Sequence, residues 1–497
     1  MYTGELNSSR RHIHEFTVCF PICLIFLPQK PIIVEVSNAA LSTDGGLIPI
    51  RQFDELIGFT QQIADALQDQ RDAKLTKHSL ISMIRQRIYG IIADYEDQND
   101  REFLRRDAIF KMIAGRSPDD PIHLAGQSTI SRFENSIQTC VLFKLRDVLF
   151  SQFIASFQTR PAQITIDLDD FDDPTHGNQQ MTLFHGFYDQ YQYLPIIATC
   201  EENDMVMLVG LRYGTCAASL GADDDLRYMV GRLRQVWPDI QIHVRGDCGF
   251  GLPLMYETCE KPGVYYTFGL SMNTRLKAAS EELLAQAELQ FKETGQKQRL
   301  FMSMHYQAET WDYQRTVSLK AESHAGGTNR RAVVSNRPGA WLFPEATYDD
   351  YTRRGESENR NKELKCDLHG DRLSDHRFMA NFFRLYLHTF ALNLLVRLRG
   401  QVSLNPAPET LGLENEQPVA AMSPKARRKY FNRRRQADVM GEGQPSTWRT
   451  RLIKVAVSVS VSCRRVVVKI SGSWPYLEHF RMVSSQILSI PPPKLNL

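Results

Sequence analysis

The sequence of 497 residues has no apolar stretch of membrane-spanning length. Its one marked apolar run near the start, from Val18 to Leu27, contains Pro21 and ends at Pro28. A spanning helix needs about 20 apolar residues, and no small-residue cleavage site follows this run. The run therefore predicts a strand-like piece or a loosely attached leader, and we expect no membrane partner.

The chain also lacks paired cysteines. Its nine cysteines are odd in number and scattered, with no Cys-x-x-Cys pair. This usage argues against a zinc site or a disulfide framework and indicates reduced thiols in a cytoplasmic protein. No internal repeat of about 20 to 50 residues is visible, which argues against a solenoid or propeller. No group of side chains points to a covalent nucleophile.

The formal net charge of +2 conceals an uneven distribution. Residues 401–497 carry 15 Lys/Arg against 6 Asp/Glu, a net charge of +9, which leaves −7 for residues 1–400. A basic end is typical of a segment that meets a polyanion such as nucleic acid. With 42% hydrophobic and 23% charged residues the composition is that of a globular protein, and the length predicts several domains.

Residues 1–36 are a leader of undefined role, and residues 37–160 are predicted to be a mainly helical DNA-binding region. Apolar residues at spacings of three and four predict helices over three segments, Phe53 to Leu67, Leu80 to Tyr95 and Leu104 to Ala114. A further capped helix within Leu124 to Asn135 carries Arg132 near its start. It resembles the second helix of a helix-turn-helix, which contacts DNA, although simple packing is the alternative.

From Ala162 the pattern changes to the alternation of strands. Several adjacent strands are followed by helices and strands in alternation, which describes a mixed sheet flanked by helices, as in the ribonuclease H fold. We therefore predict an α/β catalytic domain over residues 161–400. Thr/Val/Tyr-rich pieces break the alternation and predict a β-rich insertion at about residues 275–345. A strongly apolar helix from Phe378 to Leu398 closes the domain.

Four prolines mark residues 401–424 as a linker, and residues 425–497 form a basic C-terminal region. The cluster from Lys425 to Arg435 holds Tyr430 and Phe431 among its cations. Such a stretch can dock on a nucleic-acid backbone with stacking of its rings, with Arg433 and Arg434 as candidate contacts. The alternative is a basic tail that is simply solvated.

A cationic stripe with one carboxylate runs through residues 351–365. At helical pitch Tyr351, Arg354, Glu358, Lys362 and Lys365 recur every three or four residues. The cations suit a phosphate backbone, and the lone acid among them suits a metal ligand. A surface helix with ion pairs such as Glu358 to Lys362 is the alternative.

Three aspartates at two strand ends match Glu358. Strand alternation puts Asp167 and Asp169 on one face at the end of the first core strand, and Asp247 follows a later strand, where open α/β sheets bind ligands. Each aspartate alone could instead cap a turn. Together with Glu358 they predict a site for two Mg²⁺ ions, with Mn²⁺ as a substitute, that carries out in-line phosphoryl transfer. Whether Asp167 or Asp169 is the first ligand stays open.

The residues Asp169, Asp247 and Glu358, with Tyr351, Arg354 and Lys365, resemble the Tyr-x2-Arg-x3-Glu-x6-Lys signature of hairpin-forming insertion-sequence transposases with a DDE catalytic domain. Within that group the chain is most similar to the thirteen-eighty insertion-sequence family. The shared patterns lie at Asp167 to Gly177, Phe184 to Asp189 and Leu124 to Asn135, and the resemblance runs from about Leu41 to Tyr476.

The resemblance implies a transposase that binds terminal inverted repeats, nicks the strand, forms hairpins and joins the freed ends to target DNA. It implies phosphate contacts for Tyr351, Arg354 and Lys365, and a base-stacking or core role for Trp311 and Trp341. A homodimer on DNA and a place on the bacterial nucleoid are expected. The alternatives are a nuclease of the same fold that does not join strands, and an inactive DNA-binding derivative.

Overall fold

The computed structural model describes residues 22–24, 32–34, 39–69, 71–72, 74–97, 99–406, 411 and 424–491. Most of the predicted leader and linker lies outside these residues. Two short strands of the leader, β1 (Ile22–Leu24) and β2 (Ile32–Val34), pair antiparallel. Among the described helices, none combines the length and apolar character that crossing a membrane requires.

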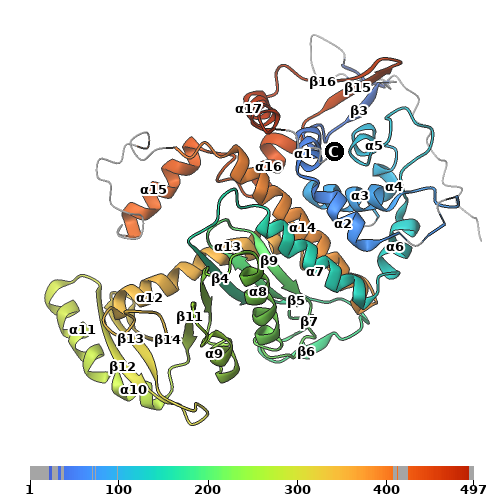
Figure 1. Cartoon of the computed structure of the whole chain (residues 1–497). Helices are drawn as coiled ribbons and strands as arrows, with labels where there is room; N and C mark the ends of the chain where they lie inside the picture. The colour runs from blue at the N-terminus through green and yellow to red at the C-terminus, as the bar shows by residue number, and fades with distance from the viewer. Residues whose placement is uncertain are drawn as a thin grey trace, which may run out of the picture.

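Helices dominate the N-terminal region (Figure 1). Their bounds are α1 Leu47–Ile57, α2 Phe59–Leu67, α3 Leu80–Ile92, α4 Arg101–Leu104, α5 Ala108–Ile113, α6 Gln127–Asn135 and α7 Thr139–Ile154. The single helix predicted from Phe53 to Leu67 is two helices, because Gly58 between them takes a left-handed conformation with φ of 65°. Residues 114–126 separate α5 from α6, a longer connection than a helix-turn-helix uses.

A mixed eight-stranded sheet forms the second half of the molecule, in the order β12-β13-β14-β11-β10-β4-β8-β9. The strands that follow the N-terminal helices are β4 Gln163–Asp170, β8 Ile196–Cys200, β9 Val206–Gly210, β10 Gln241–Gly246 and β11 Val264–Leu270. β10 pairs in parallel with β4 and β11, whereas β4 with β8 and β8 with β9 pair antiparallel. Helices α8 (Ala222–Val236) and α9 (Pro253–Cys259) connect the later strands.

The predicted β-rich insertion continues this same sheet. Its strands are β12 Gln298–Tyr306, β13 Arg315–His324 and β14 Gly327–Ser335, and β14 pairs antiparallel with β11. Two helices that the sequence pattern did not indicate, α10 (Thr274–Ala279) and α11 (Glu281–Thr294), precede the strands. The segment is therefore an extension of the sheet with its own helices.

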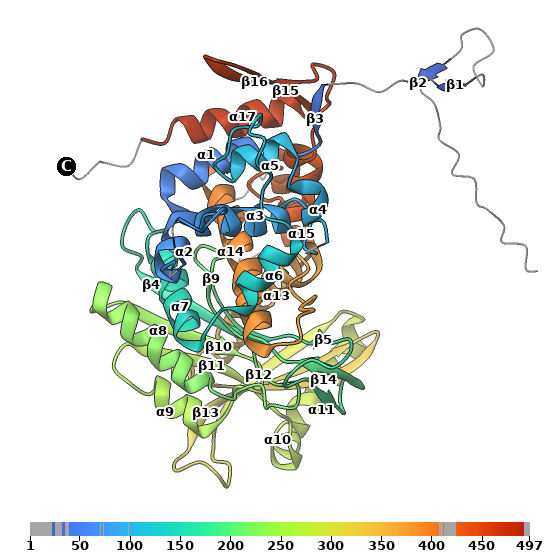
Figure 2. The same cartoon turned by 90° about the vertical axis from the view of Figure 1, so that its right-hand side faces the viewer.

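The region of the cationic stripe is helical but irregular. It runs through α12 (Pro344–Thr352), the 3₁₀ turn η1 (Arg353–Glu356), α13 (Ser357–Lys362) and the π-helical turn η2 (Glu363–Asp367). The apolar helix α14 (Phe378–Val402) follows and is buried along most of its length. It lies between the N-terminal helices and the sheet, as Figures 1 and 2 show. A helix in that position needs apolar residues on all sides.

The C-terminal region packs on the N-terminal one. Its elements are α15 Pro424–Ala437, α16 Pro445–Trp448, η5 Arg449–Ile453, β15 Val457–Ser462, β16 Arg465–Ile470 and α17 Leu477–Leu488. β15 pairs antiparallel with β3 (Ala40–Ser42), which makes a sheet from the two ends of the described chain. A separate small sheet, in the order β5-β7-β6, follows β4 directly; its strands are Asp173–Pro174, Gln190–Tyr193 and Leu183–His185.

Candidate active site

Two of the predicted acids lie at the same edge of the sheet. Gly246 of β10 is paired with Leu168 of the parallel strand β4. The residue that follows each of these in the sequence is an aspartate, Asp169 within β4 and Asp247 just after β10, so the register brings the two to neighbouring positions. Both are partly buried, and the Asp247 carboxylate contributes to raising the pKa of Asp169. Parallel pairing thus joins two residues that are far apart in the sequence.

The segment that carries Glu358 lies against this edge. Asn361 donates a hydrogen bond of 2.7 Å to Oδ2 of Asp169, and Nη1 of Arg354 lies 3.6 Å from Oδ1 of the same carboxylate. Nζ of Lys365 forms an ion pair of 2.5 Å with Asp172, just beyond β4. Glu358 is exposed and stands between Arg354 and Asn361 in the sequence.

Arg354 connects all three predicted acids electrostatically. Burial by itself would lower the pKa of the Arg354 guanidinium, yet that pKa is raised. The neighbours that raise it are Asp169, Tyr351, Asp247 and Glu358. Arg354 forms its ion pair with Asp169, and Asp247 and Glu358 lie within its electrostatic range.

Burial has a large effect on Asp169. The pKa of this carboxyl is raised to about 7, mainly by burial; Arg354 opposes the rise, and the nearby Asp170 and Asp247 add to it. Acids that are crowded in a partly buried place repel one another, and a cation is what relieves the repulsion. The oxygen donors of this edge therefore fit a hard divalent ion.

Asp167, the alternative first ligand, has a different environment. It is buried, and its Oδ1 and Oδ2 accept hydrogen bonds of 2.6 and 2.7 Å from Nε and Nη2 of Arg245. A bidentate pair of this kind occupies both oxygens of the carboxylate. The strand alternation correctly put Asp167 and Asp169 on one face, but only Asp169 is oriented toward the stripe residues.

The remaining predicted DNA-binding residues lie in different places. Tyr351 borders the site, since Asp247 and Arg354 both act on its pKa, which burial raises. Lys362 is exposed on α13, and Arg132 is exposed on α6. On α15, Arg433 donates to the backbone oxygen of Leu411 and Arg434 pairs with Glu442 at 2.7 Å. The structure thus brings Tyr351, Arg354 and Lys365 to the acids, and places the basic helix and α6 elsewhere.

The two tryptophans of the sheet extension, Trp311 and Trp341, differ in their exposure to solvent. Trp311 is buried in an aromatic cluster with Tyr256 and Tyr306, as the core alternative predicted. Trp341 is 45% exposed, and its ring stacks on His305 with centroids 4.3 Å apart. Of the two, only Trp341 presents a ring face near solvent.

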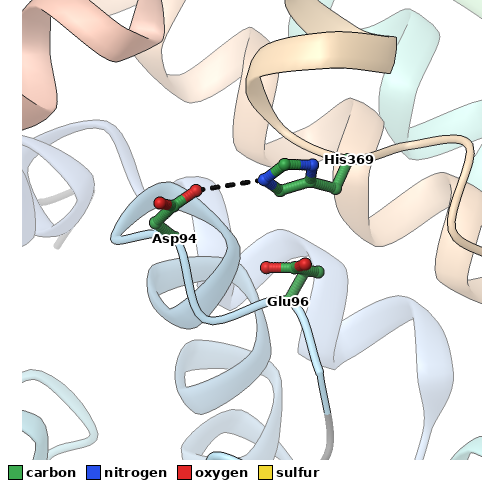
Figure 3. A group of neighbouring side chains, drawn as sticks. All are labelled: Asp94, Glu96 and His369. Carbon is green, nitrogen blue, oxygen red and sulfur yellow. Dashed lines mark hydrogen bonds and ion pairs between the residues drawn. The ribbon is translucent and has the colours of Figure 1, made fainter.

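Among the described residues, one group places three candidate metal-binding atoms within 4.8 Å of one another, and it is not the predicted triad. It consists of Asp94, Glu96 and His369 (Figure 3). Nε2 of His369 lies 3.1 Å from Oδ1 of Asp94. Arg449 forms an ion pair of 2.8 Å with Asp94, and Arg372 forms one of 2.7 Å with Glu96. The two carboxylates are thus neutralised by two arginines, and the group joins α3, η2 and the C-terminal region.

An exposed aromatic turn next to the acids was missed as part of the site. The turn between β6 and β7 carries Phe187, which is 84% exposed, and Tyr188. Gln190, which follows the turn, donates a hydrogen bond of 3.1 Å to Oδ2 of Asp172, and burial together with the charges of Asp170, Asp172, Asp169 and Asp247 raises the pKa of Tyr188, so the turn lies near these acids. The sequence signal for this turn is the run of aromatics from Phe184 to Tyr193, part of which, Phe184 to Asp189, carries the family resemblance.

The cysteines whose side chains are described are all free thiols, as the sequence predicted.

No curated protein matches the chain significantly. Among solved structures, the piggyBac transposase synaptic complex with hairpin DNA is similar, with 11% sequence identity over 92% of this chain and 89% of that chain and a TM-score of 0.38. A likeness at that level carries no weight here. The model of transposase DDE domain group 1 matches residues 26–411, most of the chain, so the protein belongs to this family of DDE transposases, metal-dependent enzymes that cleave and transfer DNA.

Proposed function

We propose that the protein carries out cut-and-paste transposition of an insertion sequence, with strand cleavage, hairpin formation and strand transfer at terminal inverted repeats. The observation that carries this proposal is that Asp169 and Asp247 lie side by side at the sheet edge, with Arg354 and Asn361 of the segment that holds Glu358 in contact with Asp169. These acids come from two strand ends and a helix, as a metal-dependent phosphoryl-transfer site requires. The kinship with the thirteen-eighty insertion-sequence family belongs to the same proposal.

The strand order supports a ribonuclease H-like core. β9, β8, β4, β10 and β11 are neighbours in that order, with β8 antiparallel to β4 and with β4, β10 and β11 parallel. The first acid is on the central strand of these five and the second follows the adjacent one. On this view residues 161–400 are the catalytic domain, and β12 to β14 enlarge its sheet.

Asp169, Asp247 and Glu358 would hold two Mg²⁺ ions, for which Mn²⁺ could substitute. When bound, such ions activate a water or a 3′-hydroxyl and stabilise the leaving oxygen. Asp169 is the better first ligand because Arg245 engages both oxygens of Asp167. Among the described residues, the ligand oxygens of Asp169, Asp247 and Glu358 do not all lie within 4.8 Å of one another.

The cations of the stripe would hold the DNA beside the cut. Arg354 and Lys365 now pair with Asp169 and Asp172, so each is available to exchange a carboxylate for a phosphate. Tyr351 and Lys362 would extend the same contact along the backbone. Further from the acids, Arg132, Arg433 and Arg434 would bind the terminal repeat, and two copies of the chain would pair the two ends of the element.

The aromatic turn suits unpaired bases at the cut. Phe187 and Tyr188 offer ring faces beside acids that would repel phosphate, and aromatic rings stack on bases of any sequence. Trp341 is a second candidate for this role. Stacking would stabilise the bases that must leave the duplex when a hairpin forms.

A strand-transfer assay with the full chain, Mg²⁺ and a duplex that ends in the inverted repeat tests the proposal. Joined products are expected, with hairpins visible on denaturing gels and two chains per complex by light scattering. Cleavage without joining would show a nuclease of the same fold. A mobility shift without any cleavage would show a DNA-binding derivative and would overturn the proposal.

A further inference from the structure

Arg245 is a fully buried arginine beside the candidate site, two residues before Asp247. Its guanidinium makes the bidentate pair with Asp167 on the neighbouring strand β4. Asp167 is in turn two residues before Asp169. One buried ion pair therefore joins the two strands just where each reaches its predicted metal ligand.

The same guanidinium also reaches two other elements. Its Nη2 lies 3.0 Å from Oε2 of Glu201, which follows β8. Its Nη1 donates a hydrogen bond of 3.0 Å to the backbone oxygen of Asp350 on α12. From Asp350 the chain leads through η1 directly to α13 and Glu358. Arg245 thus contacts β4, which carries Asp169, and itself lies on β10, which leads to Asp247. It also binds α12, the helix that precedes Glu358.

The network around Arg245 is balanced in charge. Glu201 also pairs with Arg353, and Asp350 also pairs with Arg337. A buried ion network of this type is weak evidence of stability, because well-packed apolar residues often replace such networks without loss. An apolar replacement would lose the geometry of the network, in which the planar guanidinium of Arg245 joins β4, the end of β8 and α12.

We propose that Arg245 is a positioning residue that sets the spacing of Asp169, Asp247 and Glu358 and thereby the affinity of the site for divalent ions. The inference rests on the proposed function. Asp167, Glu201 and Asp350 engage the donors of the buried Arg245, so its effect on the ions would be indirect. Residues that support metal ligands in this indirect way typically change metal affinity by about 10 to 100 fold when replaced.

The test is a titration of the full chain with Mn²⁺, in which free Mn²⁺ is followed by electron paramagnetic resonance. Arg245→Lys keeps the charge but cannot form the planar fork, and it should weaken Mn²⁺ binding by about tenfold or more. The double variant Asp167→Leu/Arg245→Met replaces the pair with apolar groups. It should keep a thermal midpoint near that of the wild type and still bind Mn²⁺ about tenfold more weakly.

Arg87→Lys is the matched control, since Arg87 is equally buried and pairs with Glu134 at 2.6 Å among the helices around α14. It should lower the thermal midpoint and leave Mn²⁺ affinity unchanged. A stable double variant with wild-type Mn²⁺ affinity would overturn the inference. A wild type that binds Mn²⁺ through Asp169 but cuts no DNA would count against the proposed function alone, whereas Mn²⁺ binding that Asp169→Asn leaves unchanged would count against both.

Discussion

Glu358 is exposed on α13, within the electrostatic reach of Arg354, and no folding role is visible for its carboxylate. Glu358→Gln keeps the size of the side chain and removes its charge. We expect DNA cleavage to fall by about 100-fold or more, because a neutral amide is a poor ligand for a hard divalent ion. Binding of the uncut repeat, measured by mobility shift, should stay unchanged. Retained cleavage would remove Glu358 from the site.

Asp169 should make stability depend on pH in the absence of metal. Its pKa of about 7 in the folded chain exceeds the value of about 3.9 in an unfolded chain. Between these values the folded state holds the extra proton, so its stability falls as the pH rises toward 7 and stays lower above it. The substitution Asp169→Asn removes this pH-dependent loss of stability.

Relative to the wild type, Asp169→Asn should therefore gain on the order of 2 kcal/mol in free energy of unfolding between pH 5 and pH 8 in EDTA, after allowance for partial solvent screening. Urea unfolding at the two pH values measures the gain. The same difference at both values would show that the carboxyl is not held in its protonated form by burial.

At this scale the sequence predicts that the two aspartates stand at strand ends, where the structure has them. The alternation of the first core strand and the position of Asp247 after a strand both follow from local patterns. The choice between Asp167 and Asp169 does not, because it depends on Arg245 in another strand. Register between strands is a long-range property, and no local pattern of the two segments specifies it.

The stripe from α12 to η2 acts as one element, although its helix is interrupted. Arg354→Gln/Lys365→Gln should weaken DNA binding and reduce the slope of log affinity against log salt by about 0.9 for each phosphate that is no longer neutralised, or about 2 in total. Lys292→Gln, at an exposed lysine of α11, is the control and should leave the slope unchanged. An unchanged slope in the double variant would argue against phosphate binding by these cations.

The turn between β6 and β7 gives a prediction of a different kind. Phe187→Ala should slow hairpin formation by about tenfold, since stacking on one base is worth about 1–3 kcal/mol. A substrate with mismatched pairs at the cut should shrink the defect, because its bases are already unpaired. Phe103→Ala, at a similarly exposed phenylalanine of α4, is the control. Equal defects on matched and mismatched substrates would exclude a stacking role.

Helices with clear apolar patterns were predicted close to their bounds: those expected from Leu80 to Tyr95 and from Phe378 to Leu398 are α3 (Leu80–Ile92) and α14 (Phe378–Val402). The helix α7 and the helices α10 and α11 were missed. So was the pairing of β14 with β11, which makes the predicted insertion part of the main sheet. A strand's sequence shows that one face is buried, but it does not identify the neighbour that covers its edge.

At the scale of the whole molecule, the structure differs most from the predicted domain division in that the helical N-terminal region and the basic C-terminal region pack together. The helical region and the basic C-terminal region were predicted as separate units, yet β15 pairs with β3 and Lys454 forms an ion pair of 2.8 Å with Asp44. Arg449 donates to the backbone oxygens of Ile91 and Ile92. These contacts make the two regions one folded body, so the basic helix α15 extends from a structured base.

Gly46 gives the sharpest test of this union. A Cβ atom there would lie 1.9 Å from the backbone oxygen of Leu452, so Gly46→Ala must displace the C-terminal segment. We expect a loss of about 1–3 kcal/mol in the free energy of unfolding. Gly231→Ala is the matched control: it lies within helix α8 with open space around it, so alanine should stabilise the protein by about 0.5–1 kcal/mol. Urea unfolding should show opposite signs for the two variants, and a neutral Gly46→Ala would mean that the C-terminal region does not pack on the N-terminal helices.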